Sequence, residues 1–565
     1  GNHLMARRVL KYLMHHVPWY GPLYLEAYRL ERDLGRSVEA LQIVERGLKA
    51  IPRYGPLWFG AFRLCETLDL SDSASNLPRT HMMFERATNN INKELIWKVH
   101  LEAAQILERA ASWFGESYPP SKMNSLLDPC RKRIAMTALS CPQNLLWKVW
   151  LAGGRMELLA GNVERARRFI LRAHYVVPEK GRVTTMLECA RLEEFVGETD
   201  LARAILCKCR GRYKSEWKVW LESVLIENRS GNYLRAVDLV REALEFHSGT
   251  GRLWAALVQL SYASGGEDGQ FLSLKCALKA VPKSGEVWCE GARILLNPFS
   301  KSFDPLEARR HLQFATRFTP QYGDSFVETL RLEAIERWAL PIAYVAWEAI
   351  KDSLSNLQKS HEWFSEAVAR SSKLVLALRD ETMMSDIDDK IQDKSVIPSL
   401  RAQLEYMNFT ELFQSSDLEL RCANADPNYG LLWFHCRHSP TDTARTVLEK
   451  AQAKIIGDLK NNIHIYVAAI VRRYAVILSA GDSTKSDGSE SNEDARNEGY
   501  PLFESLLREV SSTDEILRSN GLLNSSVSGF DFVIGLQALN RSRTVHEETF
   551  LQRKKILFGS DALFS

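Results

Sequence analysis

The sequence of 565 residues lacks the short motifs that common catalytic and nucleotide-binding sites require. It has no glycine-rich loop that would hold a phosphate and no G-x-S-x-G turn of the kind found in hydrolases. His546-Glu547-Glu548 lacks the second histidine of an H-E-x-x-H zinc site. We therefore expect no enzyme, no catalytic residue, no cofactor and no small-molecule substrate.

The ten cysteines follow no disulfide or zinc-finger spacing. Cys207 and Cys209 fall inside a helical pattern, where two packed thiols are a better interpretation than a zinc site. Cys422 and the His-Cys-Arg-His segment at 435–438 offer four metal-ligating side chains, but Trp433 marks this segment as helix core. We predict no metal site, and reduced thiols as in a nuclear, cytosolic or organellar-matrix protein.

Long apolar runs and an excess of one charge are missing as well. The most apolar stretch, residues 464–480, is interrupted by Arg472 and Arg473, so no membrane partner is expected. Lys and Arg number 73 against 70 Asp and Glu, and the net charge of +3 gives no general attraction to nucleic acid. A local basic strip remains compatible with this balance. Residues 1–8 run directly into a helical pattern, so we expect the chain to begin inside a longer protein.

What the sequence does contain is a repeat. The run Trp-Lys-Val-Trp-Leu at residues 147–151 returns at residues 217–221. An aromatic marker in the first helix of each unit gives Tyr24, Trp58, Trp97, Trp147, Thr184, Trp217, Trp254, Trp288 and Phe326, in steps of 34, 39, 50, 37, 33, 37, 34 and 38. The long step contains residues 113–124, which read as an exposed loop. A period in the mid-thirties with two helical patterns per unit is typical of an α-solenoid.

One unit shows the pattern clearly. A helix over 146–160 is followed by the turn Gly161-Asn162 and by a second amphipathic helix over 163–176. The sequence predicts an all-α fold, a right-handed α-solenoid of about ten helix-turn-helix repeats. We expect the repeat aromatics to be structural core anchors: Tyr24, Trp58, Trp97, Trp147, Trp150, Trp217, Trp220, Trp254, Trp288, Phe326 and Trp433.

The regularity of the repeat changes along the chain. Residues 1–340 form the regular array, 341–417 read as degenerate or irregular helical repeats, and 418–480 as a last repeat with closing helices. The acidic linker 481–499 is too polar to bury a core and is predicted to be disordered. Residues 500–565 read as a short helical tail without an assigned role.

The units resemble the half-a-TPR (HAT) variant of the tetratricopeptide repeat (TPR). In this repeat the first helix carries Trp, a second aromatic and Glu, and the second helix carries an Ala-Arg and a basic-Ala pair; Trp217, Trp220 and Glu222 with Arg235-Ala236 fit it. The turns at 282–290 and 421–433 are similar to those of the C-terminal array of the pre-mRNA-processing factor six family. Members of that family bridge small nuclear ribonucleoproteins in the spliceosomal tri-snRNP.

The resemblance covers roughly residues 1–460 and implies a non-catalytic scaffold of RNA processing, above all of nuclear pre-mRNA splicing. Its partners would be other proteins of a ribonucleoprotein assembly, with RNA as a second candidate. Two other functions remain open. An organellar-matrix HAT/TPR protein would bind and protect a transcript directly. A TPR-type adaptor would bind peptides, often through a Lys/Arg carboxylate clamp, which is not evident here.

A basic run on the second helices is a candidate strip for contact with RNA or a partner, because stacked repeats place equivalent positions in a row. It comprises Arg165, Arg167, Arg168, Arg172, Arg203, Arg210, Arg212 and Lys214. The alternative is a solvated face balanced by Glu164, Glu188, Glu193 and Glu194. The concave groove of the solenoid is a second candidate surface, for a peptide or helix of a partner.

Overall fold

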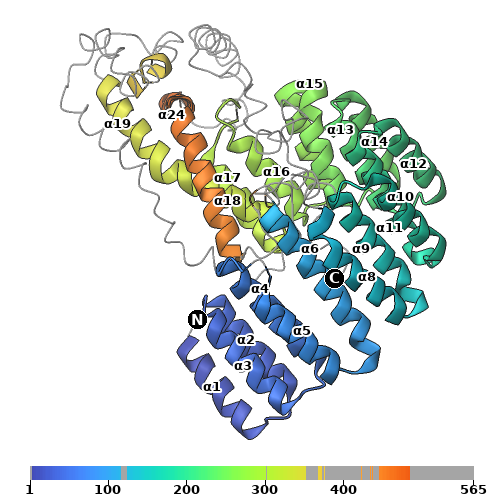
Figure 1. The fold of residues 1–565 in the computed structure, drawn as a ribbon. Coiled ribbons are helices and arrows are strands. Elements are labelled where there is room, and N and C mark those ends of the chain that lie inside the picture. The colour runs from blue at the N-terminus through green and yellow to red at the C-terminus, as the bar shows by residue number, and fades with distance from the viewer. Residues whose placement is uncertain are drawn as a thin grey trace. The chain divides into compact units, whose positions relative to one another are not determined.

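The computed structural model describes residues 3–115 except 75, 124–351 except 301, 367–371, 374–375, 421–422, 433, 436 and 444–483. Every regular element within these ranges is a helix, and most of the helices follow one another as antiparallel pairs (Figure 1). The predicted fold class is confirmed, an all-α solenoid of helix-turn-helix repeats. No helix in these ranges has the length and apolarity needed to cross a membrane.

Eight helix pairs form the described array, and we call the first helix of a pair A and the second B. The pairs are α2 (Gly21–Asp33) with α3 (Ser37–Ala50), α4 (Gly55–Ser71) with α5 (Pro78–Asn90), α6 (Ile96–Gly115) with α8 (Asp128–Ser140), α9 (Leu146–Leu159) with α10 (Val163–Val176), α11 (Arg182–Val196) with α12 (Thr199–Arg212), α13 (Trp217–Arg229) with α14 (Tyr233–Phe246), the two halves of α15 (Gly251–Ala280), and α16 (Gly285–Leu295) with α17 (Pro305–Phe318). The halves of α15 meet at Gly266, whose backbone is not helical.

Other helices flank the pairs. α1 (His3–His16) comes first; α18 (Gly323–Ala334), the π-helical turn η4 (Ile335–Ala339), α19 (Leu340–Lys351) and α24 (Ala444–Ser483) come last. Short 3-10 turns, η1 (Lys93–Leu95), η2 (Gln143–Leu145) and η3 (Glu179–Gly181), lead into α6, α9 and α11. The described chain divides between Ile226 and Glu227, within α13, into two compact units, unit 1 before this point and unit 2 after it.

The B helices form because small or apolar residues recur at positions i, i+4 and i+7. In α10 these are Ala166, Ile170 and Ala173, which are almost completely buried. The equivalent first positions of α8, α10 and α12 are Cys130, Ala166 and Ala202, each 36 residues after the last. A narrow stripe of small side chains lets each B helix approach its A helix closely and leaves the rest of the B helix outward.

The turn from A to B is set by glycine. Gly35, Gly161, Gly197 and Gly231 have φ of 75°, 78°, 102° and 80°. This left-handed conformation ends a helix and is strained for residues with a Cβ. After two of these glycines an asparagine side chain donates to the A helix: Asn162 to Glu157 at 2.8 Å and Asn232 to Glu227 at 2.9 Å.

A recurring hydrogen bond identifies the anchor of each repeat. The polar atom of an aromatic side chain donates to the backbone carbonyl six residues earlier: Tyr24 to Pro18 (3.2 Å), Trp58 to Pro52 (2.8 Å), Trp220 to Lys214 (3.0 Å), Trp254 to Ser248 (2.7 Å) and Trp288 to Pro282 (2.8 Å). From the second repeat onward, the residue before the anchor position has no exposed surface. These residues are Leu57, Val99, Val149, Thr185, Val219, Leu253, Val287 and Ser325.

This register corrects four of the sequence markers. The anchor positions are His100, Trp150, Met186 and Trp220 in place of Trp97, Trp147, Thr184 and Trp217, and the steps become 34, 42, 50, 36, 34, 34, 34 and 38. Trp97, Trp147 and Trp217 lie in the first turn of their A helices, three residues before the anchor position, and Thr184 lies two residues before it. Helix periodicity alone does not distinguish positions that are so close on one face.

The predicted core aromatics fall into two groups. Seven are at most 9% exposed, namely Tyr24, Trp58, Trp97, Trp147, Trp220, Phe326 and Trp433. Trp150, Trp217, Trp254 and Trp288 are half-buried. Packing therefore depends on the first group more than on the second.

The end of the array in unit 2 differs from the expectation. The helix predicted near 443–459 is the start of α24, which bends at Asn462 and continues to Ser483. It therefore includes the apolar stretch 464–480 and the first three residues of the expected linker. Arg472 of α24 donates to the carbonyls of Pro298 and Ser300, at 2.9 and 3.1 Å. The rest of the linker, the tail, most of 352–443 and the loop residues 116–123 lie outside the described residues.

Candidate interaction surface

Paired charges couple several of the B helices to the next A helix. The guanidinium of Arg167 in α10 donates through Nε and Nη2 to both carboxylate oxygens of Glu193 in α11, at 2.9 and 2.6 Å. Equivalent two-bond pairs join Arg7 to Glu31, Arg131 to Glu157 and Arg309 to Glu336. In these repeats, the arginine that follows the first small residue of the stripe is therefore a structural link to the next A helix.

A second set of pairs joins successive A helices. Arg155 of α9 donates to Glu188 of α11 at 2.7 Å, and Arg191 of α11 donates to Glu222 of α13 at 2.6 Å. Arg191 also reaches Glu188 at 3.3 Å, so the charges alternate along three helices. Glu188 and Glu193 are buried and occupied by these pairs. The proposal that they balance a solvated basic face is therefore wrong for these two residues.

The eight residues of the predicted strip do not form one row. Arg167 binds Glu193, Arg203 pairs with Asp200 at 2.9 Å, and Arg210 lies over the Trp220 ring, 5.7 Å from its centroid. The other members are exposed: Arg165, Arg168, Arg172, Arg212 and Lys214. Of these, Arg212 also pairs with Glu179 at 3.7 Å. Contact of the strip with RNA or a partner stays a prediction.

Three neighbouring B helices share a charge pattern that total composition conceals. Residues 129–140, 165–176 and 201–212 of α8, α10 and α12 contain eleven Lys and Arg and no Asp or Glu. The acidic residue at the start of each helix is paired three residues on: Asp128 with Arg131, Glu164 with Arg167 and Asp200 with Arg203. Residues 1–226 carry 34 basic and 24 acidic residues, a net charge of +10.

The exposed basic residues of these helices form what we call the basic face: Lys132, Arg165, Arg168, Arg172, Lys208 and Arg212. Because α8, α10 and α12 repeat with a constant spacing of 36 residues, equivalent outward positions follow one another across the array. Arg172 also lies over the ring of Trp150, 4.5 Å from its centroid. The sequence suggested the strip on α10 and α12; Lys132 on α8 and Lys208 on α12 were missed.

Neither cysteine group considered for zinc assembles a ligand set in the ranges that the structure covers. Cys207 is exposed and Cys209 is buried, so their thiols lie on different faces of α12. Cys422 and Cys436 are buried in the apolar core of unit 2, and His435 and His438 lie outside the described residues. Among the described residues no three His, Cys, Asp or Glu side chains gather in a geometry that could hold a metal.

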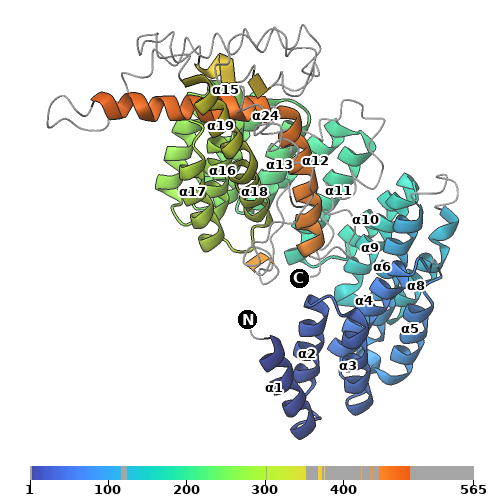
Figure 2. The same ribbon diagram turned by 90° about the vertical axis from the view of Figure 1, so that its left-hand side faces the viewer.

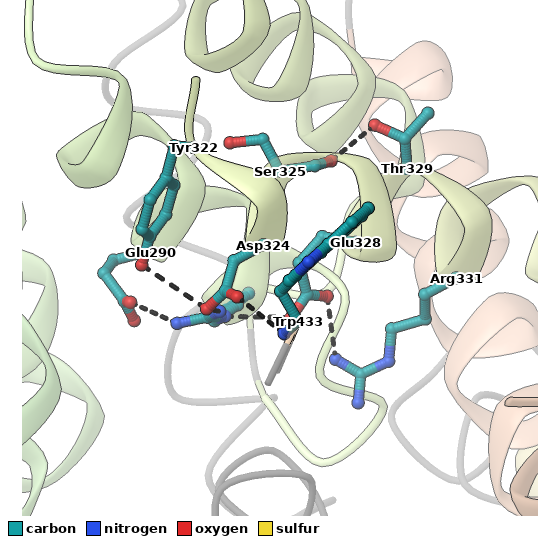
Figure 3. A network of polar contacts seen from close by, with 9 residues as sticks. Glu290, Tyr322, Asp324, Ser325, Glu328, Thr329, Arg331 and Trp433 are labelled. Atoms are coloured by element: carbon teal, nitrogen blue, oxygen red, sulfur yellow. Dashed lines mark hydrogen bonds and ion pairs between the residues drawn. The ribbon is translucent and has the colours of Figure 1, made fainter. Parts of the chain in front are cut away.

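Unit 2 contains a buried polar network that periodicity did not predict (Figure 3). Arg293 of α16 pairs with Glu290, donates through Nη2 to Asp324 at 2.6 Å, and through Nε to Glu328 at 2.8 Å. The second oxygen of Asp324 accepts the backbone N–H of Trp433 at 3.0 Å. Arg331 donates to Glu328 at 3.2 Å. The network thus ties α16, α18 and the segment at Trp433 together.

The charges of this network are unbalanced. Three buried carboxylates, on Glu290, Asp324 and Glu328, face the two guanidinium groups of Arg293 and Arg331. Burial raises the pKa of Glu290 to about 7, against the partly opposing effect of Arg293. Burial alone would lower the pKa of Arg293, but the surrounding carboxylates raise it well above its usual range. The arrangement stabilises a fold and exposes no reacting group.

Comparison with known proteins now identifies the family. Residues 1–452 match the family model described as "PRP6, TPR-like domain". The chain belongs to this family. The resemblance seen in the repeat turns is thereby confirmed, and the pairs between B and A helices belong to a PRP6 TPR-like array.

A TPR-containing protein of Dictyostelium discoideum is 40% identical over 458 residues, which cover 81% of this chain. The chain spans 28% of the length of that relative. Among solved structures, yeast Tom70 matches with a TM-score of 0.30 and 12% identity, over 75% of this chain and 99% of Tom70. The Cut9-Hcn1 hetero-tetramer of the APC/C matches with a TM-score of 0.25 and 14% identity, over 58% of each chain.

In this PRP6 TPR-like array, the neighbouring residues Arg167 and Arg168 of α10 are expected to differ in their contribution to stability. Arg167→Ala leaves the buried Glu193 without its two hydrogen bonds and is expected to lower the free energy of unfolding by about 1–2 kcal/mol. Arg168→Ala removes an exposed side chain and is expected to stay within about 0.5 kcal/mol of wild type. Denaturant titration of both variants checks this, and equal midpoints for the two would contradict the structural assignment of Arg167.

Proposed function

We propose that this chain serves pre-mRNA splicing in the nucleus as a non-catalytic scaffold that holds proteins of a ribonucleoprotein assembly. The family and the fold make it a helical-repeat scaffold. The match of the PRP6 TPR-like model to residues 1–452 is the observation that carries the splicing assignment. Protein partners come first in this proposal, and RNA on the basic face comes second.

The mechanism that we propose is geometric. Charge pairs such as Arg167 with Glu193 and Arg155 with Glu188 hold one repeat against the next without occupying the outward faces of the B helices. The exposed side chains on these faces would contact partners, and contacts spread over several repeats add up. The scaffold would thus set the spacing between bound factors.

Recovery of partners from nuclear extract tests the splicing assignment. The full chain is immobilised, and bound material is analysed by mass spectrometry and RNA sequencing, with and without ribonuclease treatment of the extract. We expect proteins of the tri-snRNP with their small nuclear RNAs, and retention of some of these proteins after ribonuclease treatment.

Other outcomes would replace this function. One or two organellar transcripts, recovered from matrix extract without snRNP proteins, would favour a transcript-protecting organellar protein. Chaperones without RNA would favour a peptide-binding adaptor. A double variant, Arg165→Glu with Arg168→Glu, tests whether the basic face holds RNA, because both arginines are exposed. Loss of RNA with the proteins retained would separate the two kinds of partner.

A further inference from the structure

Five large apolar side chains stand exposed beside the basic face. On α8 these are Met136 and Leu139, exposed by 44% and 89%, and on α10 they are Leu171, Tyr175 and Val176, exposed by 51%, 85% and 39%. Leu139 and Tyr175 occupy equivalent positions 36 residues apart and are more exposed than any other large apolar side chain in the described part of the chain. We call these five residues the apolar row.

The two helices that carry the row are neighbours in unit 1. Both pack against α9, and both views show α8, α9 and α10 side by side (Figure 1, Figure 2). At Gly153 of α9, a Cβ atom would lie 3.4 Å from the ring of Phe169 in α10 and 3.5 Å from Ile134 in α8. Side chains of α8 and α10 therefore both reach the same residue of α9, so the two helices that carry the row are neighbours.

Basic side chains flank the apolar row, and one of them, Arg212, pairs at 3.7 Å with Glu179, which follows α10. Lys132 lies one turn before Met136 on α8, and Arg168 and Arg172 flank Leu171 on α10. On α12, one repeat further, Lys208 and Arg212 take the positions equivalent to Met136 and to the residue after Leu139. The B helix α14 differs, because it carries Asp238, Glu242 and Glu245 among its basic residues.

We propose that the apolar row and the basic face together dock an amphipathic, acidic segment of a partner protein. Such a segment buries its apolar face on the row, whose five side chains are otherwise exposed to water. Its carboxylates meet the positive side chains of the basic face, which speeds association and disfavours basic segments. This inference rests on the repeat scaffold and is independent of its assignment to splicing.

The chemistry of the row favours polypeptide over nucleic acid. Single-stranded nucleic acid is held by successive aromatic side chains on which bases stack. The row offers one aromatic ring, that of Tyr175, and four aliphatic or thioether side chains. Those four fit the leucines and methionines of an amphipathic helix.

Fluorescence anisotropy with the full chain tests the proposal. The probe is a labelled helical peptide of twenty residues with leucine on one face and glutamate on the other. A scrambled peptide of the same composition, whose leucines share no face, is the first comparison, and a twenty-nucleotide oligouridylate is the second. We expect the amphipathic peptide to bind tightest, with an affinity that falls as salt rises.

Surface variants then locate the site. The double variant Leu139→Ser, Tyr175→Ser is expected to weaken binding of the amphipathic peptide by at least about tenfold. Adding Arg168→Glu to this double variant is expected to weaken binding of the peptide further at low salt. Met82→Ser is the matched control, since Met82 is a 53% exposed apolar residue on the B helix α5 of the same unit; it is expected to bind like wild type. Unchanged thermal melts show that the variants are folded.

Three results would overturn the proposal. Equal affinity for the scrambled peptide would show that the apolar row is not used. An unchanged affinity of the double variant would place the peptide elsewhere. Tighter binding of oligouridylate, in competition with the peptide, would make this face a nucleic-acid surface. Recovery of snRNP proteins from extract does not enter this test, so the splicing assignment and the docking site can fail separately.

Discussion

Replacing Arg293 by methionine is expected to lower the free energy of unfolding of unit 2 by about 3–5 kcal/mol, because it leaves buried carboxylates without their cation. Arg293 pairs with Glu290, Asp324 and Glu328, and none of the four side chains is more than 8% exposed. Because methionine fills a similar volume, the loss of stability would come from the missing positive charge more than from altered packing. Denaturant titration measures this loss of stability, and hydrogen exchange of α16 and α18 shows whether it is located at the network.

Glu290→Gln is the matched comparison, because it keeps a hydrogen-bonding side chain and removes one of the three negative charges. An unfolded glutamate has a pKa of about 4.3, and burial raises the pKa of Glu290 to about 7. Between these values the folded state holds a proton that the unfolded state has released. The contribution of Glu290 to stability therefore falls as pH rises through this window and is constant above about pH 7.

We expect Glu290→Gln to gain stability relative to wild type as pH rises from about 5 to about 7, the window between the two pKa values. Arg293→Met should be less stable than wild type throughout this range. A difference between Glu290→Gln and wild type that does not change with pH would contradict the raised pKa of Glu290. A wild-type melt for Arg293→Met would show that the network contributes little.

Trp58→Ala is expected to lower the free energy of unfolding of unit 1 by about 3–5 kcal/mol through the cavity it creates. The Trp58 side chain is 1% exposed, and its Nε1 donates to the carbonyl of Pro52 at 2.8 Å. It packs in the core cluster that also contains Phe62 and Phe84. Loss of the ring should loosen α4 against α3 and α5 and reduce their hydrogen-exchange protection.

Two controls separate the causes. Trp19→Ala removes a tryptophan that is 72% exposed and is expected to change stability by no more than about 0.5 kcal/mol. Trp58→Phe keeps an aromatic ring and removes the donor to Pro52, so it should fall between wild type and Trp58→Ala. Equal losses for Trp19→Ala and Trp58→Ala would refute the assignment of Trp58 as a repeat anchor.

The sequence predicted the local elements well where helix periodicity and turn residues agreed. The B helix at 163–176 has its predicted bounds. The A helix of the same repeat ends at Leu159, one residue earlier than expected. Gly161 marks the turn because the backbone there needs a positive φ. These features depend on a few neighbouring residues, so they can be recognised from the sequence.

The choice between neighbouring residues depended on tertiary structure. Trp217 and Trp220 lie three residues apart on one face of α13, and only the path of the chain before the helix places the carbonyl of Lys214 beside Trp220. Arg167 and Arg168 differ by about 100° around α10, so that only Arg167 reaches the next A helix. Periodicity gives the face of a helix but not the partner that will lie against it.

The sequence by itself determined the repeat, the all-α class, the family and the basic character of α10 and α12, because each is written in local spacing and residue type. Only the tertiary structure decided which charges are used inside the molecule. Arg293 meets carboxylates up to 35 residues away, and Asp324 accepts a hydrogen bond from Trp433, 109 residues along the chain. Such pairs form when packed helices bring distant residues within hydrogen-bond range, and a buried charge is stable only where that packing supplies its partner.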